Sequence, residues 1–242
     1  MSSQKAIEVV IFDWGGTLTP WADIDVLDSW RAYSRVVRPD DAESLAQTLA
    51  TAEVARWAEQ RRTAGHAGTG RLDQLLSEHG IDTESEVHRY ALAAYDQWWT
   101  PYTLCDPQAA PLMLALRERG LRIGVLSNTQ WPVGVHDAVL VRDGLQHLID
   151  GAVYTSELRV GKPHPDAFRA ALDSVGVESP ASAVFVGDRP YDDVHGAQMF
   201  GMRAILLAHG GIAASELVAV ETEPDAVVSE LADVLGVIDS WL

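Results

Sequence analysis

Short apolar runs recur along the chain, and most are followed by a stretch with apolar residues at helical spacing. Short runs that are rich in β-branched residues are typical of strands buried on both faces. The runs occupy residues 9–12, 122–126, 152–154, 183–186, 204–207 and 226–228. The helices that follow them are expected around residues 108–119, 134–148, 165–175, 192–200 and 231–238. Repeated strand-then-helix units predict an α/β fold in which a doubly wound parallel sheet carries helices on both faces.

The pattern changes after the first run, because residues 21–99 contain no strand-like run. Apolar residues recur there at helical spacing instead. The helices expected in this part span residues 28–37, 42–63, 72–79 and 84–99. The glycine-rich residues 65–70 lack the Gly-Lys-Ser/Thr of a phosphate-binding loop, so we interpret them as a connection. The predicted organisation is a core of residues 1–20 and 101–242 with an inserted α-helical cap of residues 21–100.

Charge and composition narrow the classes of partner. The net charge of −17 would repel nucleic-acid phosphates and anionic lipid, so we expect neither nucleic acid nor a membrane as partner. No apolar stretch approaches the ~18 residues that span a bilayer. Because residues 1–5 lead directly into the first run, we expect no signal peptide. The lone cysteine, Cys105, fits a reducing cytoplasm. We therefore expect a cytoplasmic protein that acts on a small molecule and exists as a monomer or homodimer.

Polar side chains follow several of the apolar runs or stand at the start of a helix. They are Asp13, Ser127, Lys162 and the acidic group Asp188, Asp192 and Asp193. The carboxyl ends of parallel strands meet at one edge of a sheet, where open α/β folds bind their ligands. Lys162 is conspicuous because Lys5 is the only other lysine among 18 basic residues. In a chain that otherwise uses arginine, it indicates a need for a compact ammonium group.

These residues occur in the order of the sequence motifs of the haloacid dehalogenase superfamily. The first motif is Asp13-Trp14-Gly15-Gly16-Thr17, and the others contain Ser127, Gly161-Lys162-Pro163 and Gly187-Asp188 with Asp192-Asp193. The chain resembles that family over essentially its whole length. The resemblance implies a Rossmann-like core with a helical cap, and a hydrolase activity.

The resemblance also implies a role for each motif residue. Asp13 would be the nucleophile, Ser127 would hydrogen-bond the transferring phosphoryl group, and Lys162 would steady both. Gly16, Thr17 and Asn128 would contact the substrate. Mg²⁺, which prefers oxygen ligands, would be held by Asp13, Asp188 and the backbone carbonyl of Gly15. Asp192 or Asp193 would hold a metal-bound water or Lys162.

Gly15 departs from the family pattern, because the phosphatase branch usually carries a second aspartate there as general acid. General acid catalysis contributes roughly 10²–10⁴-fold when the leaving group is poor. A glycine still offers its carbonyl oxygen to a metal, so only the proton donor is lost. The favoured interpretation is a magnesium-dependent hydrolase of a small phosphorylated metabolite, which forms an aspartyl-phosphate on Asp13 without the usual acid.

Other activities of the family fit the sequence less well. Phosphonate cleavage needs a cap lysine for a Schiff base, and none occurs between Lys5 and Lys162. Haloacid dehalogenation stays an alternative, since Asn128 and the arginines of residues 31–38 could cradle a halide, although the acidic motif argues against it. A catalytically weak member of the fold that binds a phosphorylated ligand or a partner protein is the third possibility.

Tryptophans in the predicted cap have two interpretations. They are Trp21, Trp30, Trp57, Trp98 and Trp99. They could line a substrate pocket, but large aromatic residues at helical spacing more often pack in a core.

Overall fold

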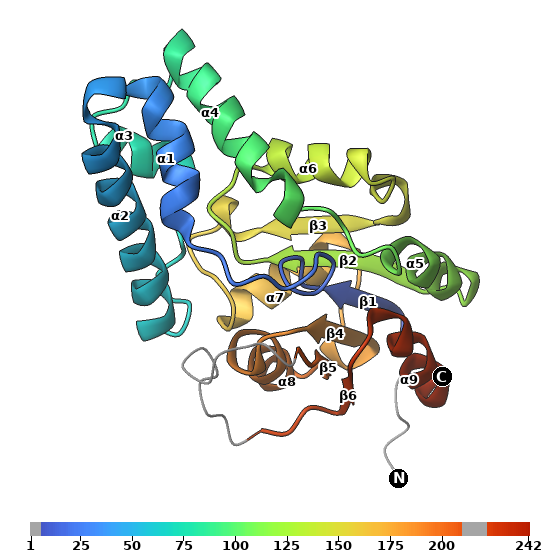
Figure 1. Ribbon diagram of the computed structural model, residues 1–242. Coiled ribbons are helices and arrows are strands. Elements are labelled where there is room, and N and C mark those ends of the chain that lie inside the picture. Colours follow the sequence, from blue (N-terminus) through green and yellow to red (C-terminus); the bar gives the residue numbers. More distant parts are fainter. Residues whose placement is uncertain (1–5, 210–221) are drawn as a thin grey trace.

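The computed structural model describes residues 6–209 and 222–242, and its centre is a six-stranded sheet (Figure 1). Residues 1–5, on which the expected direct entry into the first strand depends, lie outside the described part. The strands are β1 (Val9–Phe12), β2 (Arg122–Ser127), β3 (Gly151–Tyr154), β4 (Ala183–Gly187), β5 (Arg203–Leu207) and β6 (Ala226–Val228). Their order is β3-β2-β1-β4-β5-β6 and every pairing is parallel. The expected doubly wound parallel sheet is confirmed.

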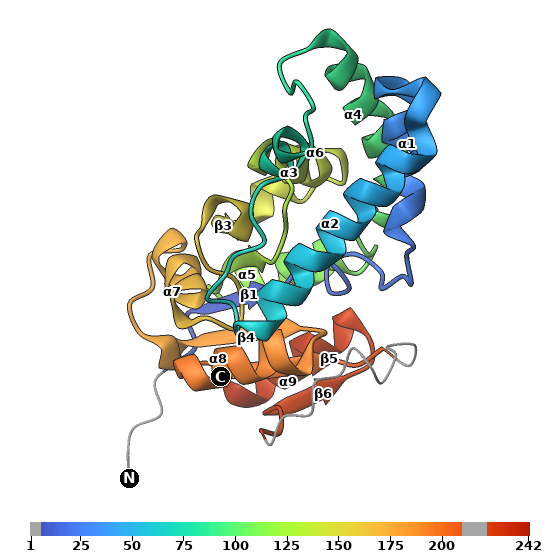
Figure 2. The same cartoon turned by 90° about the vertical axis from the view of Figure 1, so that its left-hand side faces the viewer.

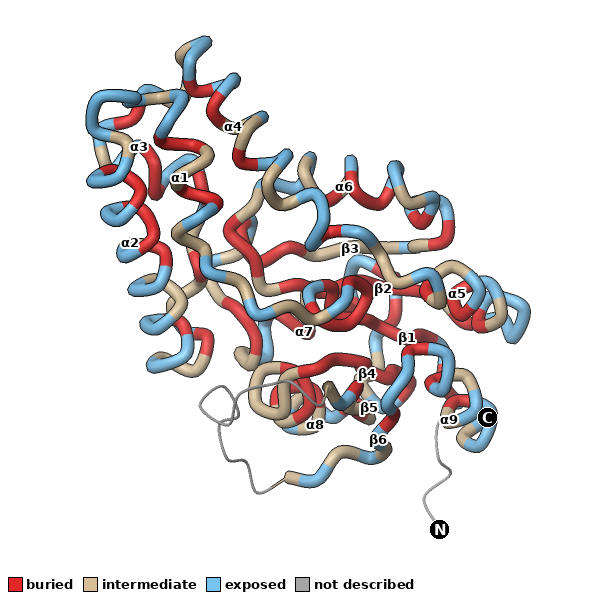
Figure 3. The backbone as a smooth tube through the Cα atoms, in the orientation of Figure 1, coloured by how far each residue is buried: buried red, intermediate tan, exposed pale blue. Residues whose placement is uncertain are grey.

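Helices cover both faces of the sheet because successive strand residues point to opposite sides. In β1, Val10 and Phe12 pack on one face against α5 (Ala109–Glu118), α6 (Val133–Arg142) and α9 (Val234–Trp241). Val9 and Ile11 pack on the other face against α7 (Pro165–Ser174) and α8 (Gly196–Phe200). All four residues of β1 are fully buried, as the red central strands of Figure 3 show.

The insertion between β1 and α5 is helical. It contains α1 (Val26–Val37), α2 (Ala42–Arg62), α3 (Leu72–Glu78) and α4 (Glu86–Trp99). These helices have their own apolar core, in which Trp30 and Tyr33 are fully buried against Leu49, Leu75 and Tyr95. Figure 2 shows α2 running from the far end of the insertion to the sheet. In the described part of the chain, no helix combines the length and hydropathy that crossing a membrane requires.

Two expected helices of the core are interrupted. The stretch expected as one helix over residues 134–148 ends at Arg142, because Gly144 adopts φ +73°, and a 3₁₀ turn (Gln146–Leu148) follows. The helix expected over residues 192–200 is a π-helical turn (Pro190–His195) followed by α8. Further 3₁₀ turns occupy Pro39–Asp41, Thr100–Tyr102, Thr155–Glu157, Pro180–Ser182 and Leu231–Asp233.

A close approach between β3 and α7 generates a stability prediction. A Cβ at Gly151 would lie 2.5 Å from the backbone oxygen of Ser174, so Gly151→Ala must shift backbone and should lower the free energy of unfolding by about 1–3 kcal/mol. Gly236, on the exposed side of α9, has nothing within 4 Å of the position that a Cβ would take. Gly236→Ala should raise stability by about 0.5–1 kcal/mol through helix propensity. Urea unfolding of both variants measures this, and equal effects would contradict the packing described.

Candidate active site

A buried lysine lies between two carboxylates at the carboxyl edge of the sheet. The Nζ atom of Lys162 is 2.5 Å from Oδ1 of Asp13 and 2.7 Å from Oδ1 of Asp193. Lys162 is 2% exposed, Asp13 6% and Asp193 0%. A charge removed from water this completely is tolerated only when it is paired. The two carboxylates therefore make this position possible for the ammonium group.

Neighbouring strands deliver the acidic residues and the serine to this edge. Asp13 directly follows β1, and its N–H extends the β1–β4 pairing by donating to Val186 at 2.9 Å. Asp188 directly follows β4, and Ser127 is the last residue of β2. Because β1 lies between β2 and β4, the three side chains converge, as the sequence predicts.

Lys162 reaches the site from a loop rather than from a strand. The amide of Asn128 holds its backbone at both ends: Lys162 N–H donates to Oδ1 at 2.8 Å, and Nδ2 donates to the Lys162 carbonyl at 3.0 Å. Gln60 of α2 donates to the same carbonyl. Asn128, predicted from the resemblance to contact substrate, has its amide committed to positioning Lys162.

Three carboxylates at this edge are close enough to share a cation. Ligand atoms of Asp13, Asp188 and Asp193 all lie within 4.8 Å of one another. Both carboxylate oxygens of Asp188 are buried without a hydrogen-bond partner, although Nε of Arg189 lies 3.4 Å from Oδ2. Buried oxygens of this kind are normally satisfied, and oxygen-only sets suit Mg²⁺ or Ca²⁺. The residues present thus fit a divalent cation.

The pKa values of the cluster reflect an excess of negative charge. Burial raises the pKa of Asp13, and Lys162 opposes that rise without cancelling it. Burial, together with the charges of Asp13 and Asp193, raises the pKa of Asp188, and burial raises that of Asp192 to about 7. Burial lowers the pKa of Lys162, but Asp13 and Asp193 outweigh it and keep the ammonium charged. One ammonium does not neutralise so many carboxylates, so a cation would relieve the remaining repulsion.

Glycines make room for this crowded arrangement. Gly16 has φ +83°, and a Cβ there would lie 2.6 Å from Oδ2 of Asp188. A Cβ at Gly187 would overlap the carboxyl group of Asp193. Gly15 differs, because nothing lies within 4 Å of its Cβ position. The place where the phosphatase branch carries its acid is open space.

The site opens into a cavity of about 930 Å³ between the core and the inserted helices. The core contributes Asp13, Gly15, Ser127, Asn128, Lys162, Asp192 and Asp193 to its lining. Among the described residues, Gly16 and Thr17 do not line it. The backbone N–H of Gly16 donates to Oγ1 of Thr19 at 3.4 Å, and Oγ1 of Thr17 is buried without a partner. Asp192 lines the cavity but stands outside the close set of three carboxylates.

The inserted helices contribute lining residues that the sequence motifs do not reveal. They include Glu53, Trp57, Gln60 and Arg61 of α2 and Trp99 of α4. The only signal for them is the spacing of residues 53, 57, 60 and 61, which places them on one helical face. Of the tryptophans with two interpretations, Trp57 and Trp99 line the cavity, whereas Trp30 is packed in the core of the insertion.

The glycine-rich segment interpreted as a connection is also hydrogen-bonded to the core. Gly161 N–H donates to Gly65 O at 2.9 Å, Gly68 N–H to Arg159 O at 3.0 Å and Thr69 Oγ1 to Thr129 O at 2.7 Å. Just beyond the segment, Leu72 N–H at the start of α3 donates to Gln130 O at 2.8 Å. Two of the core loops involved carry Asn128 and Lys162. The segment therefore ties the insertion to the loops that form the site.

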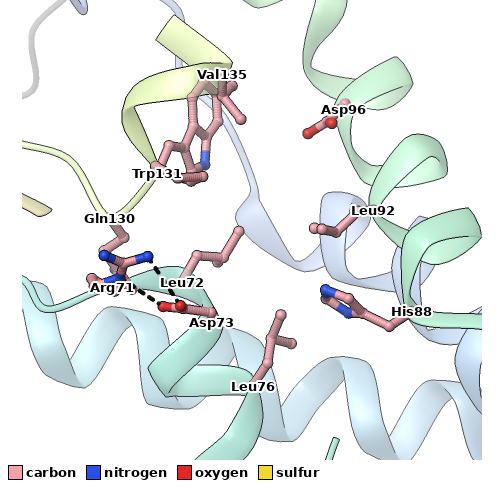
Figure 4. A pocket seen from close by; sticks show the side chains of 11 residues that line it. Arg71, Leu72, Asp73, Leu76, His88, Leu92, Asp96, Gln130, Trp131 and Val135 are labelled. Carbon is pink, nitrogen blue, oxygen red and sulfur yellow. Dashed lines mark hydrogen bonds and ion pairs between the residues drawn. The ribbon is translucent and has the colours of Figure 1, made fainter. Parts of the chain in front are cut away.

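A smaller cavity of about 100 Å³ lies beside this junction (Figure 4). Leu72 and Leu76 of α3, Leu92 of α4 and Val135 of α6 form its apolar walls. None of the three clustered carboxylates lines it. Gln130 and Trp131 line both cavities and separate them.

Known proteins share this architecture. The family model for haloacid dehalogenase-like hydrolases matches residues 7–201. The chain is 29% identical over 209 residues to the glyceraldehyde 3-phosphate phosphatase of Methanopyrus kandleri, covering 84% of this chain and 85% of that protein. A 2-haloacid dehalogenase from Pseudomonas syringae is 25% identical with TM-score 0.64, covering 98% and 100% of the two chains. A HAD phosphatase from Thermococcus onnurineus is 19% identical with TM-score 0.67, covering 96% and 98%. The protein belongs to the haloacid dehalogenase-like hydrolase family and is a hydrolase.

Proposed function

We propose that the protein is a magnesium-dependent phosphatase of small phosphorylated metabolites that works through an aspartyl-phosphate on Asp13. The observation that carries the proposal is the buried Lys162 ammonium, which lines a large cavity together with Asp13 and Asp193 and lies in a cluster of carboxylates that Asp188 completes. Residues 21–100 would act as the cap, and residues 1–20 and 101–242 as the core. The lone cysteine supports a cytoplasmic location.

Asp13, Asp188 and the carbonyl of Gly15 would hold the Mg²⁺ ion. When bound, the ion neutralises charge between the carboxylate and a phosphate dianion. Asp13 lines the cavity and attacks phosphorus in line: a bond forms between its carboxylate oxygen and phosphorus as the ester P–O bond breaks, and the leaving oxygen takes its proton from water because residue 15 is a glycine. Water then hydrolyses the acyl phosphate and restores the carboxylate.

The remaining residues stabilise charge on the transferring group. Lys162 presents a fixed ammonium to the phosphoryl oxygens, because Asp193 and Asn128 hold the side chain and the backbone. Ser127 lines the cavity, and the only hydrogen bond of its Oγ among the described residues is a long one of 3.4 Å to the carbonyl of Asn128. It is therefore available to a phosphoryl oxygen. Such preorganised donors act without reorganisation cost in a site shielded from water.

The dehalogenase alternative is disfavoured by the acidic cluster. Displacing a halide requires no cation, whereas the buried and unpartnered oxygens of Asp188 call for one. The cluster would also repel a departing halide ion. Asn128, which could cradle a halide, has both ends of its amide bound to Lys162.

The nucleophile is tested by Asp13→Asn. We expect turnover of an aryl phosphate with Mg²⁺ to fall by at least ~10³-fold, because an amide oxygen neither attacks phosphorus nor balances the ammonium of Lys162. Steady-state phosphate release measures it. Asp40→Asn, which removes an exposed carboxylate of the insertion, is the matched control. Unchanged turnover in Asp13→Asn, or metal-independent halide release from 2-haloacids, would contradict the proposal.

The metal site is tested by the pH dependence of stability. The raised pKa values mean that the folded protein binds more protons than the unfolded chain between about pH 4 and about pH 8, so the free energy of unfolding falls progressively as pH rises through that window. A divalent cation favours the ionised forms. The increase in Tm on replacing EDTA with Mg²⁺ should therefore grow from about pH 5 to about pH 8. Asp188→Asn should abolish that growth, and a Tm increase independent of pH would argue against the site.

The missing general acid is tested by Gly15→Asp. The Cβ position is open and the backbone there is not left-handed, so the side chain fits. We expect turnover of alkyl phosphates to rise by about 10–100-fold, and turnover of aryl phosphates to change much less, because only a poor leaving group needs the proton. Gly15→Asn has the same size without an acidic proton and is the control. An equal gain for both kinds of ester would show that the gain does not come from a restored proton donor.

A further inference from the structure

Helix α2 runs along the cavity, and the side chains that line the cavity differ between the two ends of this stretch of the helix. Gln60 at the end of this helix donates to the carbonyl of Lys162, and Arg61 lines the cavity together with Lys162 and Asp192. This end of α2 therefore lies at the proposed phosphate site. Glu53 lines the same cavity about two helical turns earlier, which is ~10 Å along the helix axis.

Glu53 supplies a carboxylate to this second end. It is 8% exposed, and Nε1 of Trp30 donates to its Oε2 at 2.7 Å. The other carboxylates that line the cavity follow β1 or β4, so Glu53 is the one that the inserted helices contribute. Among the described residues no ion pair includes Glu53. Burial raises the pKa of Glu53, and hydrogen bonds from the indole N–H groups of Trp30 and Trp57 oppose that rise. A cation bound nearby would stabilise the ionised carboxylate further.

Aromatic rings and an unpaired amide line the same cavity as Glu53. Trp57, Trp99 and Trp131 line the cavity, and the rings of Trp99 and Trp131 lie 5.1 Å apart at 76°. Indole faces attract cations more strongly than other aromatic rings. Gln130 is 3% exposed, lines the cavity, and has neither amide atom hydrogen-bonded. Buried amide atoms are costly when unpaired, which indicates that a ligand pairs with them.

We propose, resting on the phosphatase function above, that the substrate is a phosphomonoester whose alcohol carries an ammonium group. Glu53 and the indoles of Trp57, Trp99 and Trp131 bind that group. At one end of the cavity the Lys162 ammonium and the Arg61 guanidinium are positive partners for the phosphate, and at the other end Glu53 is a negative partner for an ammonium group. A leaving group that ends in a carboxylate would meet Glu53 without a compensating arginine there, because the arginines that line the cavity lie elsewhere: Arg61 and Arg62 in the last turn of α2, and Arg189 at 3.4 Å from Asp188.

Glu53 is too far along α2 from the proposed phosphate site to act as a proton donor. A general acid must reach the leaving oxygen within hydrogen-bond distance. Glu53 lies ~10 Å along the helix from the residue that contacts Lys162. It is therefore a residue that determines specificity by binding the far end of the substrate.

Phosphocholine and 3,3-dimethylbutyl phosphate test the proposal, because they differ only in a positively charged nitrogen against a neutral carbon. We expect kcat/KM to favour phosphocholine by ~10-fold or more in the unmodified protein. Glu53→Gln should bring that ratio close to one, and Trp57→Leu should lower it severalfold. Glu43→Gln, which removes an exposed glutamate of the same helix that is paired with Arg31, is the matched control and should keep the full ratio.

The outcomes separate this inference from the proposed function. A ratio near one in the unmodified protein, or a ratio that Glu53→Gln and Trp57→Leu both leave unchanged, overturns the ammonium site. If no phosphate ester is hydrolysed, an aryl phosphate included, the phosphatase proposal fails instead. Calorimetric binding of the two esters to the same variants then tests the ammonium site. Tighter binding of phosphocholine that is lost in Glu53→Gln would support the site, and equal binding of the two esters to the unmodified protein would contradict it.

Discussion

The buried ammonium of Lys162 is the interaction on which the rest of the site depends. It is almost completely removed from water, so it persists only because Asp13 and Asp193 lie within 2.7 Å of it. Their charge, together with that of Asp188, exceeds what one ammonium neutralises. The cluster that stabilises the lysine therefore has uncompensated negative charge, which a divalent cation would neutralise. Charge balance links the nucleophile, the lysine and the proposed metal site into one unit.

Lys162 also connects the sheet to the inserted helices. Its backbone carbonyl accepts hydrogen bonds from Asn128 of the core and from Gln60 of α2, and the neighbouring Gly161 bonds to Gly65. The cavity is thus enclosed by elements that share contacts with the proposed catalytic lysine. The helix proposed to select the substrate and the lysine proposed to stabilise charge are therefore in direct contact, although Gln60 and Lys162 are 102 positions apart in the chain.

Most of the fold and the members of the acidic cluster followed from the sequence, because apolar runs and the residues after them are local signals. The parallel sheet was confirmed, and Asp13, Ser127 and Asp188 came together since strand ends converge. The helix expected over residues 134–148 was wrong beyond Arg142, where a glycine with positive φ ends it. The two hydrogen bonds by which Asn128 holds the Lys162 backbone were not predictable, because they join two loops that are distant in the sequence.

The sequence by itself determined the strands, the carboxylates that follow them, the lysine at position 162 and the absence of an acid at Gly15. Tertiary structure decided which of two adjacent aspartates meets Lys162, because consecutive residues of the turn Pro190–His195 point in different directions. It also decided which face of α2 borders the cavity. Glu53 and Trp57 occupy helical positions like any others in the chain, and only the packing of the insertion against the core makes them cavity residues.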